Sequence, residues 1–188
     1  MLSTCDESNQ ERSTTGDAPS ATLFFDLIPS PIGDLFVAVG PAGVVALEFH
    51  PDGGEAVRLA AIRGARVIRS SEAVAPVAAQ LAEYFAGCRR QFDLAMDLSG
   101  LSAFERDVLA AVAQIPPGQT LTYGEVARAV GKPAASQAVG QALGRNPVPI
   151  VIPCHRVIAG GGRIGGYSGR GGVETKQALL RLEGGLLL

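Results

Sequence analysis

The hydrophobic pattern of the chain changes its period near the middle, and this change limits the folds that are possible. Short apolar or alternating runs come first, at residues 23–28, 35–39 and 44–49, with proline- and glycine-rich segments between them. Such runs between turn residues predict β-hairpins. From residue 102 onward, apolar side chains recur at helical spacing instead. The sequence therefore predicts an α+β fold, in which a small β-sheet and helix domain precedes a mainly helical domain.

This pattern divides the chain into three segments. Residues 1–21 are dominated by Ser, Thr, Asp, Glu, Asn and Gln, and we expect them to form a disordered tail. Residues 22–98 form the predicted N-terminal α+β domain, with a helix at 71–86 and a last strand near 92–98. The apolar stripe of that helix consists of Val74, Val77, Ala78, Leu81 and Phe85. Residues 99–188 form the predicted C-terminal domain.

Capping boxes mark two helix starts in the C-terminal segment. Ser102 and Thr122 each stand three residues before a glutamate, so that hydroxyl and carboxylate can each satisfy a free backbone N–H group. Helices are expected at residues 102–115, 122–130 and 134–143. The last two are short and joined by the tight turn Gly131-Lys132-Pro133, a pattern that predicts a helix-turn-helix of the winged type.

The helix predicted at residues 134–143 has two different faces. One is a core stripe of Ala135, Ala138, Val139, Ala142 and Leu143. The other is small and uncharged, and consists of Ser136, Gln137, Gly140, Gln141 and Gly144. Small residues permit the close approach of a large partner such as a nucleic-acid groove. An ordinary alanine-rich packing helix is the alternative interpretation.

Charge is distributed unevenly along the chain. Residues 1–100 hold 7 Lys and Arg against 13 Asp and Glu, whereas residues 101–188 hold 9 against 5. A basic C-terminal half suggests contact with a polyanion, although an uneven surface explains the numbers equally well. Candidate phosphate contacts are Arg128, Lys132, Arg145 and Arg170, each of which can also be an ordinary solvated charge.

Cysteine spacing and the first residues indicate the compartment. Cys5, Cys88 and Cys154 are too far apart for a disulfide framework or a paired metal motif. The chain begins without the basic start and apolar stretch of a signal peptide, and contains no apolar run of about 18 residues. We therefore expect a cytoplasmic protein without a metal site and without a membrane partner.

Reactive chemistry is concentrated between Arg145 and Ile158, where the chain reads Arg-Asn-Pro-Val-Pro-Ile-Val-Ile-Pro-Cys-His-Arg-Val-Ile. The prolines prevent a full strand ladder, so the segment is expected to follow an extended, rigid and largely buried path. It places Cys154 at the edge of a core, directly before His155 and Arg156. Cationic neighbours lower the pKa of a thiol, which favours a reactive cysteine over a structural one.

Asn146-Pro147 followed by Ile-Pro-Cys-His-Arg-Val at residues 152–157 resembles the active-site signature of the O6-alkylguanine–DNA alkyltransferases. The resemblance covers about residues 102–183, and more weakly the chain from residue 23. It implies a DNA repair protein that flips O6-alkylguanine out of duplex DNA and transfers the alkyl group irreversibly to Cys154. Each molecule would react once, without a cofactor. O4-alkylthymine is a further candidate lesion.

The resemblance also implies roles for individual residues. Cys154 is the acceptor, His155 its base through a water molecule, and Glu183 the group that polarises the imidazole. Asn146 ties the helix-turn-helix to the active-site segment. The pocket for the flipped base includes Tyr123, Pro149, Val157, Tyr167 and Ser168. The residues that contact DNA are Arg128, Ala135, Ser136, Gln137, Gly140, Arg145 and Arg156.

Two features depart from the family pattern. Gln137 stands where the family usually has an arginine that fills the gap left by the extruded base. We expect Gln137 to insert there with weaker support for the flipped state. The zinc ligands of some relatives are also missing, which agrees with the expectation that no metal is bound.

Other function classes remain alternatives at this point. A non-catalytic alkyltransferase-like protein binds lesions without repairing them, but such proteins usually replace the cysteine by tryptophan, and this chain keeps Cys154 and has no Trp. A cysteine hydrolase needs an oxyanion hole, which a proline-bounded segment does not clearly offer. A helix-turn-helix regulator leaves the Cys-His-Arg sequence unexplained. We expect a monomer, and clustering along DNA stays open.

Overall fold

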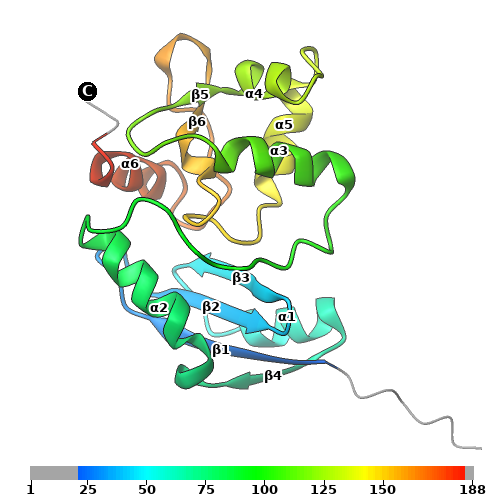
Figure 1. The fold of residues 1–188 in the computed structure, drawn as a ribbon, viewed down its shortest axis with the longest axis vertical. Coiled ribbons are helices and arrows are strands. Elements are labelled where there is room, and N and C mark those ends of the chain that lie inside the picture. The colour runs from blue at the N-terminus through cyan, green and yellow to red at the C-terminus, as the bar shows by residue number, and fades with distance from the viewer. Residues whose placement is uncertain (1–20, 185–188) are drawn as a thin grey trace, which may run out of the picture.

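The computed structural model describes residues 21–184, so the predicted disordered tail at residues 1–21 lies, except for its last residue, outside the described part. A four-stranded sheet with two helices forms one end of the molecule, and a group of helices forms the other (Figure 1). The α+β fold class is confirmed. No helix within the described residues is long and apolar enough to cross a membrane.

The sheet is built from β1 (Thr22–Ile28), β2 (Leu35–Gly40), β3 (Gly43–Phe49) and β4 (Arg66–Arg69). Its order is β3-β2-β1-β4, with the first three strands antiparallel and β4 parallel to β1. The three strands predicted between residues 23 and 49 are confirmed. Four consecutive residues of β2, from Leu35 to Ala38, are buried, because both faces of this central strand are covered.

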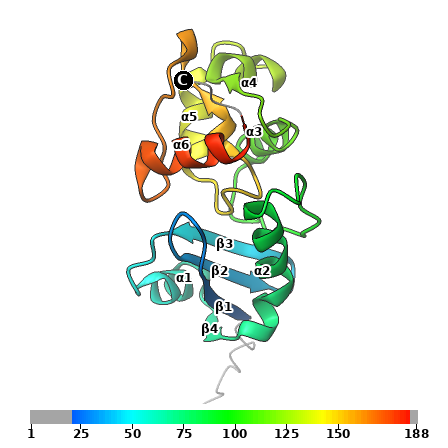
Figure 2. The same cartoon turned by 90° about the vertical axis from the view of Figure 1, so that its left-hand side faces the viewer.

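Helices α1 (Glu55–Arg63) and α2 (Ser71–Phe85) cover opposite faces of the sheet (Figure 2). The α2 helix confirms the prediction for residues 71–86. Its buried stripe, however, contains Tyr84 in addition to Val74, Val77 and Leu81. The elements α1 and β4 were not predicted.

The strand predicted near residues 92–98 is wrong. Only one isolated bridge forms there, between Met96 and Val44 of β3. Further along the same edge, the N–H group of Leu47 donates 2.8 Å to the carbonyl of Pro147 instead. The edge of β3 is therefore shared with the segment that leads to Cys154, and the sheet touches the reactive segment directly.

The second half contains α3 (Ala103–Ala113), α4 (Tyr123–Ala129), α5 (Ser136–Gly144) and α6 (Gly172–Leu182), with short turns η1 (Cys154–Arg156) and η2 (Gly160–Gly162). Both predicted capping boxes are present, at Ser102 and at Thr122. The α5 helix begins at Ser136, two residues later than expected. The helix-turn-helix is formed by α4 and α5.

A two-stranded parallel sheet links the helix-turn-helix to the reactive segment. Strand β5 (Leu121–Thr122) precedes α4 and pairs with β6 (Val157–Ile158), which follows η1. This pairing places Tyr123, the first residue of α4, beside the chain that carries Cys154.

Candidate functional site

The proline-bounded segment before Cys154 is buried, but it is not extended as expected. Residues 148–152 fold back in a tight turn, in which the N–H group of Ile152 donates to the carbonyl of Val148 at 3.0 Å. Ile150 has a φ of 72°, a strained conformation for a β-branched residue. The side chain of Asn146 holds the turn at both ends, donating 2.9 Å to Ile152 and accepting 3.1 Å from Val148.

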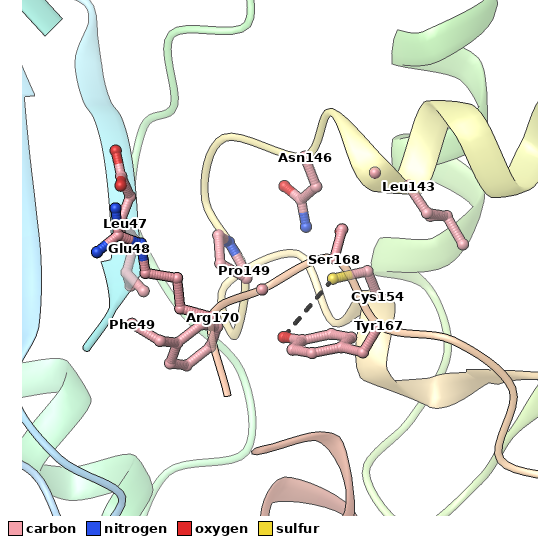
Figure 3. A pocket seen from close by; sticks show the side chains of 12 residues that line it. Leu47, Glu48, Phe49, Leu143, Asn146, Pro149, Cys154, Tyr167, Ser168 and Arg170 are labelled. Atoms are coloured by element: carbon pink, nitrogen blue, oxygen red, sulfur yellow. Dashed lines mark hydrogen bonds between the residues drawn. The ribbon is translucent and has the colours of Figure 1, made fainter. Parts of the chain in front are cut away.

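Cys154 follows this turn as the first residue of η1 and is 6% exposed. Its thiol points toward Tyr167 and donates a long hydrogen bond of 4.0 Å to the phenolic oxygen (Figure 3). Burial raises the pKa of the thiol, although Asn146, Tyr167 and Lys176 oppose this shift. The expectation that cationic neighbours lower the pKa is therefore wrong, and the thiol needs a base to remove its proton.

Glu183 forms hydrogen bonds with the two side chains that follow Cys154 in sequence. The Nε2 atom of His155 lies 3.0 Å from the Oε1 atom of Glu183. Arg156 donates from Nε to Oε2 at 2.9 Å and from Nη2 to Oε1 at 2.7 Å. A further Arg156 nitrogen donates to the carbonyl of Ile115. Both side chains point to Glu183, which explains why neither of them stabilises the thiolate directly.

The charges of this buried group can be assigned. Burial acts to raise the pKa of Glu183, but the hydrogen bonds from His155 and Arg156 outweigh it and lower the pKa to about 2. Burial lowers the pKa of His155, although Glu183 opposes the shift, so the imidazole is neutral near pH 7. Because Nε2 faces a carboxylate, it carries the proton. The Nδ1 atom has no hydrogen-bond partner among the described residues and is available to accept a proton.

Lys176 is a functional candidate that the sequence reasoning missed. It is fully buried, and its Nζ atom donates to the carbonyls of Val157 at 2.6 Å and Gly166 at 3.2 Å. Burial lowers its pKa to about 8. A local signal was present, because Lys176 shares one helical stripe with Leu179, Leu180 and Glu183.

Cys154 lines two adjoining cavities. The first, of about 250 Å³, extends toward the sheet, and Figure 3 shows the side chains around it. It is lined by Leu47, Glu48, Phe49, Leu143, Gly144, Asn146, Pro149, Cys154, Tyr167, Ser168, Gly169 and Arg170. The second, of about 160 Å³, lies beside the helix-turn-helix. It is lined by Tyr123, Gly140, Leu143, Gly144, Cys154, Gly166, Tyr167 and Ser168.

Most of the residues predicted for the base pocket are thus brought together. Tyr123, Tyr167 and Ser168 line the second cavity with Cys154, and Pro149 lines the first. Val157 lines neither cavity, since it is fully buried with its carbonyl engaged by Lys176. Cys154 therefore lines two adjoining cavities, one of which lies beside the predicted DNA-binding helices.

The residues predicted to contact DNA lie mostly on the outer face of α4 and α5. Ser136, Gln137 and Arg128 are exposed. The Arg145 side chain is 72% exposed and pairs with Glu105 at 2.8 Å. Ala135 and Gly140 are half-buried. This placement is compatible with a groove-facing surface.

Two other arginines differ from expectation. Arg156 is only 4% exposed and bound by Glu183, so its guanidinium is not available to a phosphate group. This burial does not favour the DNA contact predicted for Arg156. Arg170 is exposed, but pairs with Asp52 at 2.6 Å and donates to the carbonyl of His50 at 3.3 Å. It ties the loop around Tyr167 to the sheet-bearing half.

Comparisons with known proteins identify relatives across almost the whole described chain. Residues 103–185 match the family model described as 6-O-methylguanine DNA methyltransferase, DNA binding domain. A methylated-DNA–protein-cysteine methyltransferase of Methanosarcina barkeri is 39% identical over 163 residues, which are 86% of this chain and 97% of that protein. One from Mycolicibacterium paratuberculosis is 51% identical over 104 residues, covering 55% of this chain and 61% of the relative.

Solved structures show the same similarity in three dimensions. The crystal structure of Mycobacterium tuberculosis OGT in complex with DNA superposes with a TM-score of 0.74 at 36% sequence identity. The match covers 87% of this chain and 92% of that chain. The similarity therefore includes both the sheet-bearing half and the half that carries Cys154.

Proposed function

The chain belongs to the methylated-DNA–protein-cysteine methyltransferase family, and from this premise we propose that it repairs O6-alkylguanine in duplex DNA by moving the alkyl group to its own Cys154. The observation that carries the proposal is the position of the Cys154 sulfur. It lines both cavities and directly precedes a neutral, buried His155 whose Nε2 is bound by Glu183. A nucleophile, a base and an orienting carboxylate are thus present together.

Duplex DNA would bind along the outer face of α4 and α5. An alkyl group on O6 is inaccessible inside a base pair, so the damaged guanine has to leave the stack, at a cost of a few kcal/mol that a weakened pair reduces. The second cavity lies beside α5 and contains Tyr123 and Ser168, which suits it to receive the purine. The alkyl group would then project toward Cys154 and the first cavity.

The transfer itself forms one bond and breaks one. The thiol proton of Cys154 passes through a water molecule to Nδ1 of His155, and the sulfur attacks the alkyl carbon. The carbon–O6 bond breaks, and its electron pair stays on the guanine. The guanine takes up one proton at N1, and the imidazolium of His155 releases through solvent the one proton that it took from the thiol. Glu183 stabilises the imidazolium that forms in between, as an ionised carboxylate does in acid–base pairs of this kind.

Hydroxyl groups would stabilise the departing guanine. Tyr123 and Ser168 line the cavity that receives it, and burial raises the pKa of Tyr123, which therefore keeps its proton for donation. Preorganised donors at a developing negative charge lower the barrier of the chemical step. The product is a thioether, which water does not cleave at a useful rate, so each molecule reacts once.

The experiment that tests the proposal follows the DNA. Protein is incubated with excess duplex oligonucleotide carrying one O6-methylguanine, and the restored guanine is counted after digestion. We expect the yield to stop at one guanine per protein molecule for the parent protein and for Cys88→Ser, in which an exposed cysteine is replaced. Cys154→Ser should restore none. Binding of the lesion without restoration by the parent protein would instead identify a non-catalytic lesion binder.

A further inference from the structure

The hydroxyl group of Tyr84 reaches the carboxylate of Glu183 from the half of the molecule that contains the four-stranded sheet. Tyr84 lies at the end of α2, is 3% exposed, and donates 2.8 Å to the Oε1 atom of Glu183. Its ring is fixed by Phe85 and Phe92, with centroids 5.3 Å and 5.5 Å away. The contact bridges 99 positions in sequence and joins the sheet-bearing half to the reactive segment.

Three donors, among them Tyr84, converge on the Oε1 atom of Glu183. An ionised carboxylate offers about four lone-pair sites. Arg156 fills two of them, one on each oxygen. His155 and Tyr84 both approach Oε1, at 3.0 Å and 2.8 Å. The imidazole of His155 and the phenol of Tyr84 therefore share a single carboxylate oxygen with Nη2 of Arg156.

We propose that Tyr84 is a positioning residue for the Glu183–His155 pair. Its hydroxyl fixes the orientation of Glu183 and reduces the attraction of Oε1 for the Nε2 proton of His155. The half that contains the four-stranded sheet thus adjusts the basicity of His155, although Cys154 lies in the other half. This inference rests on the proposed function, because His155 matters to catalysis only if Cys154 transfers the alkyl group.

The protonation state of Tyr84 agrees with this role. Burial, together with the charge of Glu183, raises the pKa of Tyr84 far above its usual range, so the phenol is a permanent donor. A hydrogen bond to a charged acceptor in a buried place is stronger than one between neutral groups. Removing it leaves Oε1 with fewer donors and a greater negative charge facing His155.

The other charged groups around the Glu183–His155 pair are unchanged when only the Tyr84 hydroxyl is removed. His155 is influenced by Glu183 at the end of α6, by Arg156 on η1 and by Lys176 on α6. On the outer side, Arg89 and Arg90 line a shallow hollow over Tyr84 and Glu183. None of these charges is altered in Tyr84→Phe, which keeps the ring and its aromatic contacts.

The test uses the imidazole of His155 directly. The sequence contains only two histidines, so ¹⁵N-labelled imidazole resonances of His155 are assigned by comparison with His50→Gln. In Tyr84→Phe we expect the Nε2 proton resonance to move to lower field and the pKa of His155 to rise by about half a pH unit. The acid fall of the single-turnover transfer rate should begin at a correspondingly higher pH, with little change near pH 8.

The matched control is Gln80→Ala, one helical turn earlier on α2. Gln80 exchanges two hydrogen bonds of 2.9 Å with the backbone of Asp93, so its loss weakens the same helix without touching Glu183. We expect the control to lower the unfolding temperature and to leave the His155 resonances and the rate profile unmoved.

Unchanged His155 resonances in Tyr84→Phe would overturn the inference, and so would a moved resonance with an unmoved rate profile. Either result leaves the proposed function intact if the parent protein still restores guanine. Conversely, a parent protein that fails to restore guanine refutes the proposed function, and the rate profile on which this inference depends disappears with it.

Discussion

The two halves of the molecule bury different kinds of side chain. Within the described residues, the half at 21–98 has a largely apolar interior and one buried charged residue, Glu55. The half at 99–184 buries Glu105, which closes a capping box, and then His155, Arg156, Thr175 and Lys176. The Glu183 side chain is 2% exposed and belongs with them.

This difference indicates that the half at 99–184 contains buried charges that contribute less to stability than apolar packing would. A buried charge has to be paired, and even a paired one is seldom more stabilising than apolar packing. In the first half, Glu55 serves local structure, since it accepts from the backbone of Asp52 and Gly53 and from Arg58. In the second half, His155 and Arg156 directly follow Cys154 and are bound by Glu183, and the charge of Lys176 acts on the Cys154 thiol. The concentration of buried charge marks the site more clearly than the cysteine does.

Replacing one buried carboxylate in each half tests this contrast, and has the largest expected effect. In Glu183→Gln an amide nitrogen replaces one carboxylate oxygen and cannot accept the hydrogen bonds that this oxygen accepts. The substitution also removes the negative charge that compensates Arg156. We expect the transfer rate per folded molecule to fall by about a hundredfold or more. Stability should fall by about 3–5 kcal/mol, because a buried partner is left unpaired. Single-turnover kinetics and urea unfolding measure the two effects.

Glu55→Gln is the matched change in the other half. It should also destabilise the protein, by about 1.5–3 kcal/mol, because Glu55 is 2% exposed and fully engaged in hydrogen bonds. The transfer rate of the folded fraction should stay within about twofold of the parent. Equal loss of transfer in the two variants would contradict a division of labour between the halves.

Lys176→Met tests one buried charge of the second half through the pH dependence of the free energy of unfolding. The pKa of Lys176 is lowered from 10.5 to about 8, so between these values the unfolded chain holds a proton that the folded protein has released. The free energy of unfolding therefore rises with pH in this interval. We expect Lys176→Met to lose this slope, measured by urea unfolding from about pH 8 to 9.5.

The same variant should slow the transfer about tenfold, which corresponds to about 1.4 kcal/mol. Lys176 joins the carbonyls of Val157 and Gly166, and its charge opposes the rise in the pKa of Cys154. An unchanged rate in a variant that has lost the pH slope would show that Lys176 is structural only.

Gln137→Arg is expected to give the smallest effect, and it tests whether DNA contact belongs to the second half. An arginine here should tighten lesion binding about three- to tenfold and steepen the dependence of log Kd on log salt by about one. Gln91→Arg adds the same charge on an exposed position of the first half, and should change neither quantity appreciably. If both variants tightened binding equally, charge alone would explain the result.

Local signals in the sequence predicted much of the fold. Ser102 and Thr122 mark their helices by capping boxes, which depend on neighbours only three residues away. The tight turn at residues 148–152 was not predicted, because the Asn146 side chain stabilises it against the preference of Ile150. The missing strand near residue 95 has a similar cause, since Pro147 occupies part of the edge of β3.

The site was predictable only in part. Cys154, His155, Glu183 and Asn146 followed from the resemblance, and the structure brings them close together. Tyr84 could not be found, because nothing local relates it to a glutamate 99 positions away. The buried state of Arg156 was hidden for the same reason. Contacts between distant segments depend on the assembled fold, which no short pattern contains.

The central claim is that the sulfur of Cys154 becomes the permanent carrier of the alkyl group. The most direct measurement locates that group by peptide mass spectrometry after the protein has reacted with duplex DNA containing O6-methylguanine. We expect the peptide with Cys154 to gain one methyl in place of hydrogen and the peptide with Cys88 to stay unchanged. Restored guanine together with an unmodified Cys154 peptide would contradict it.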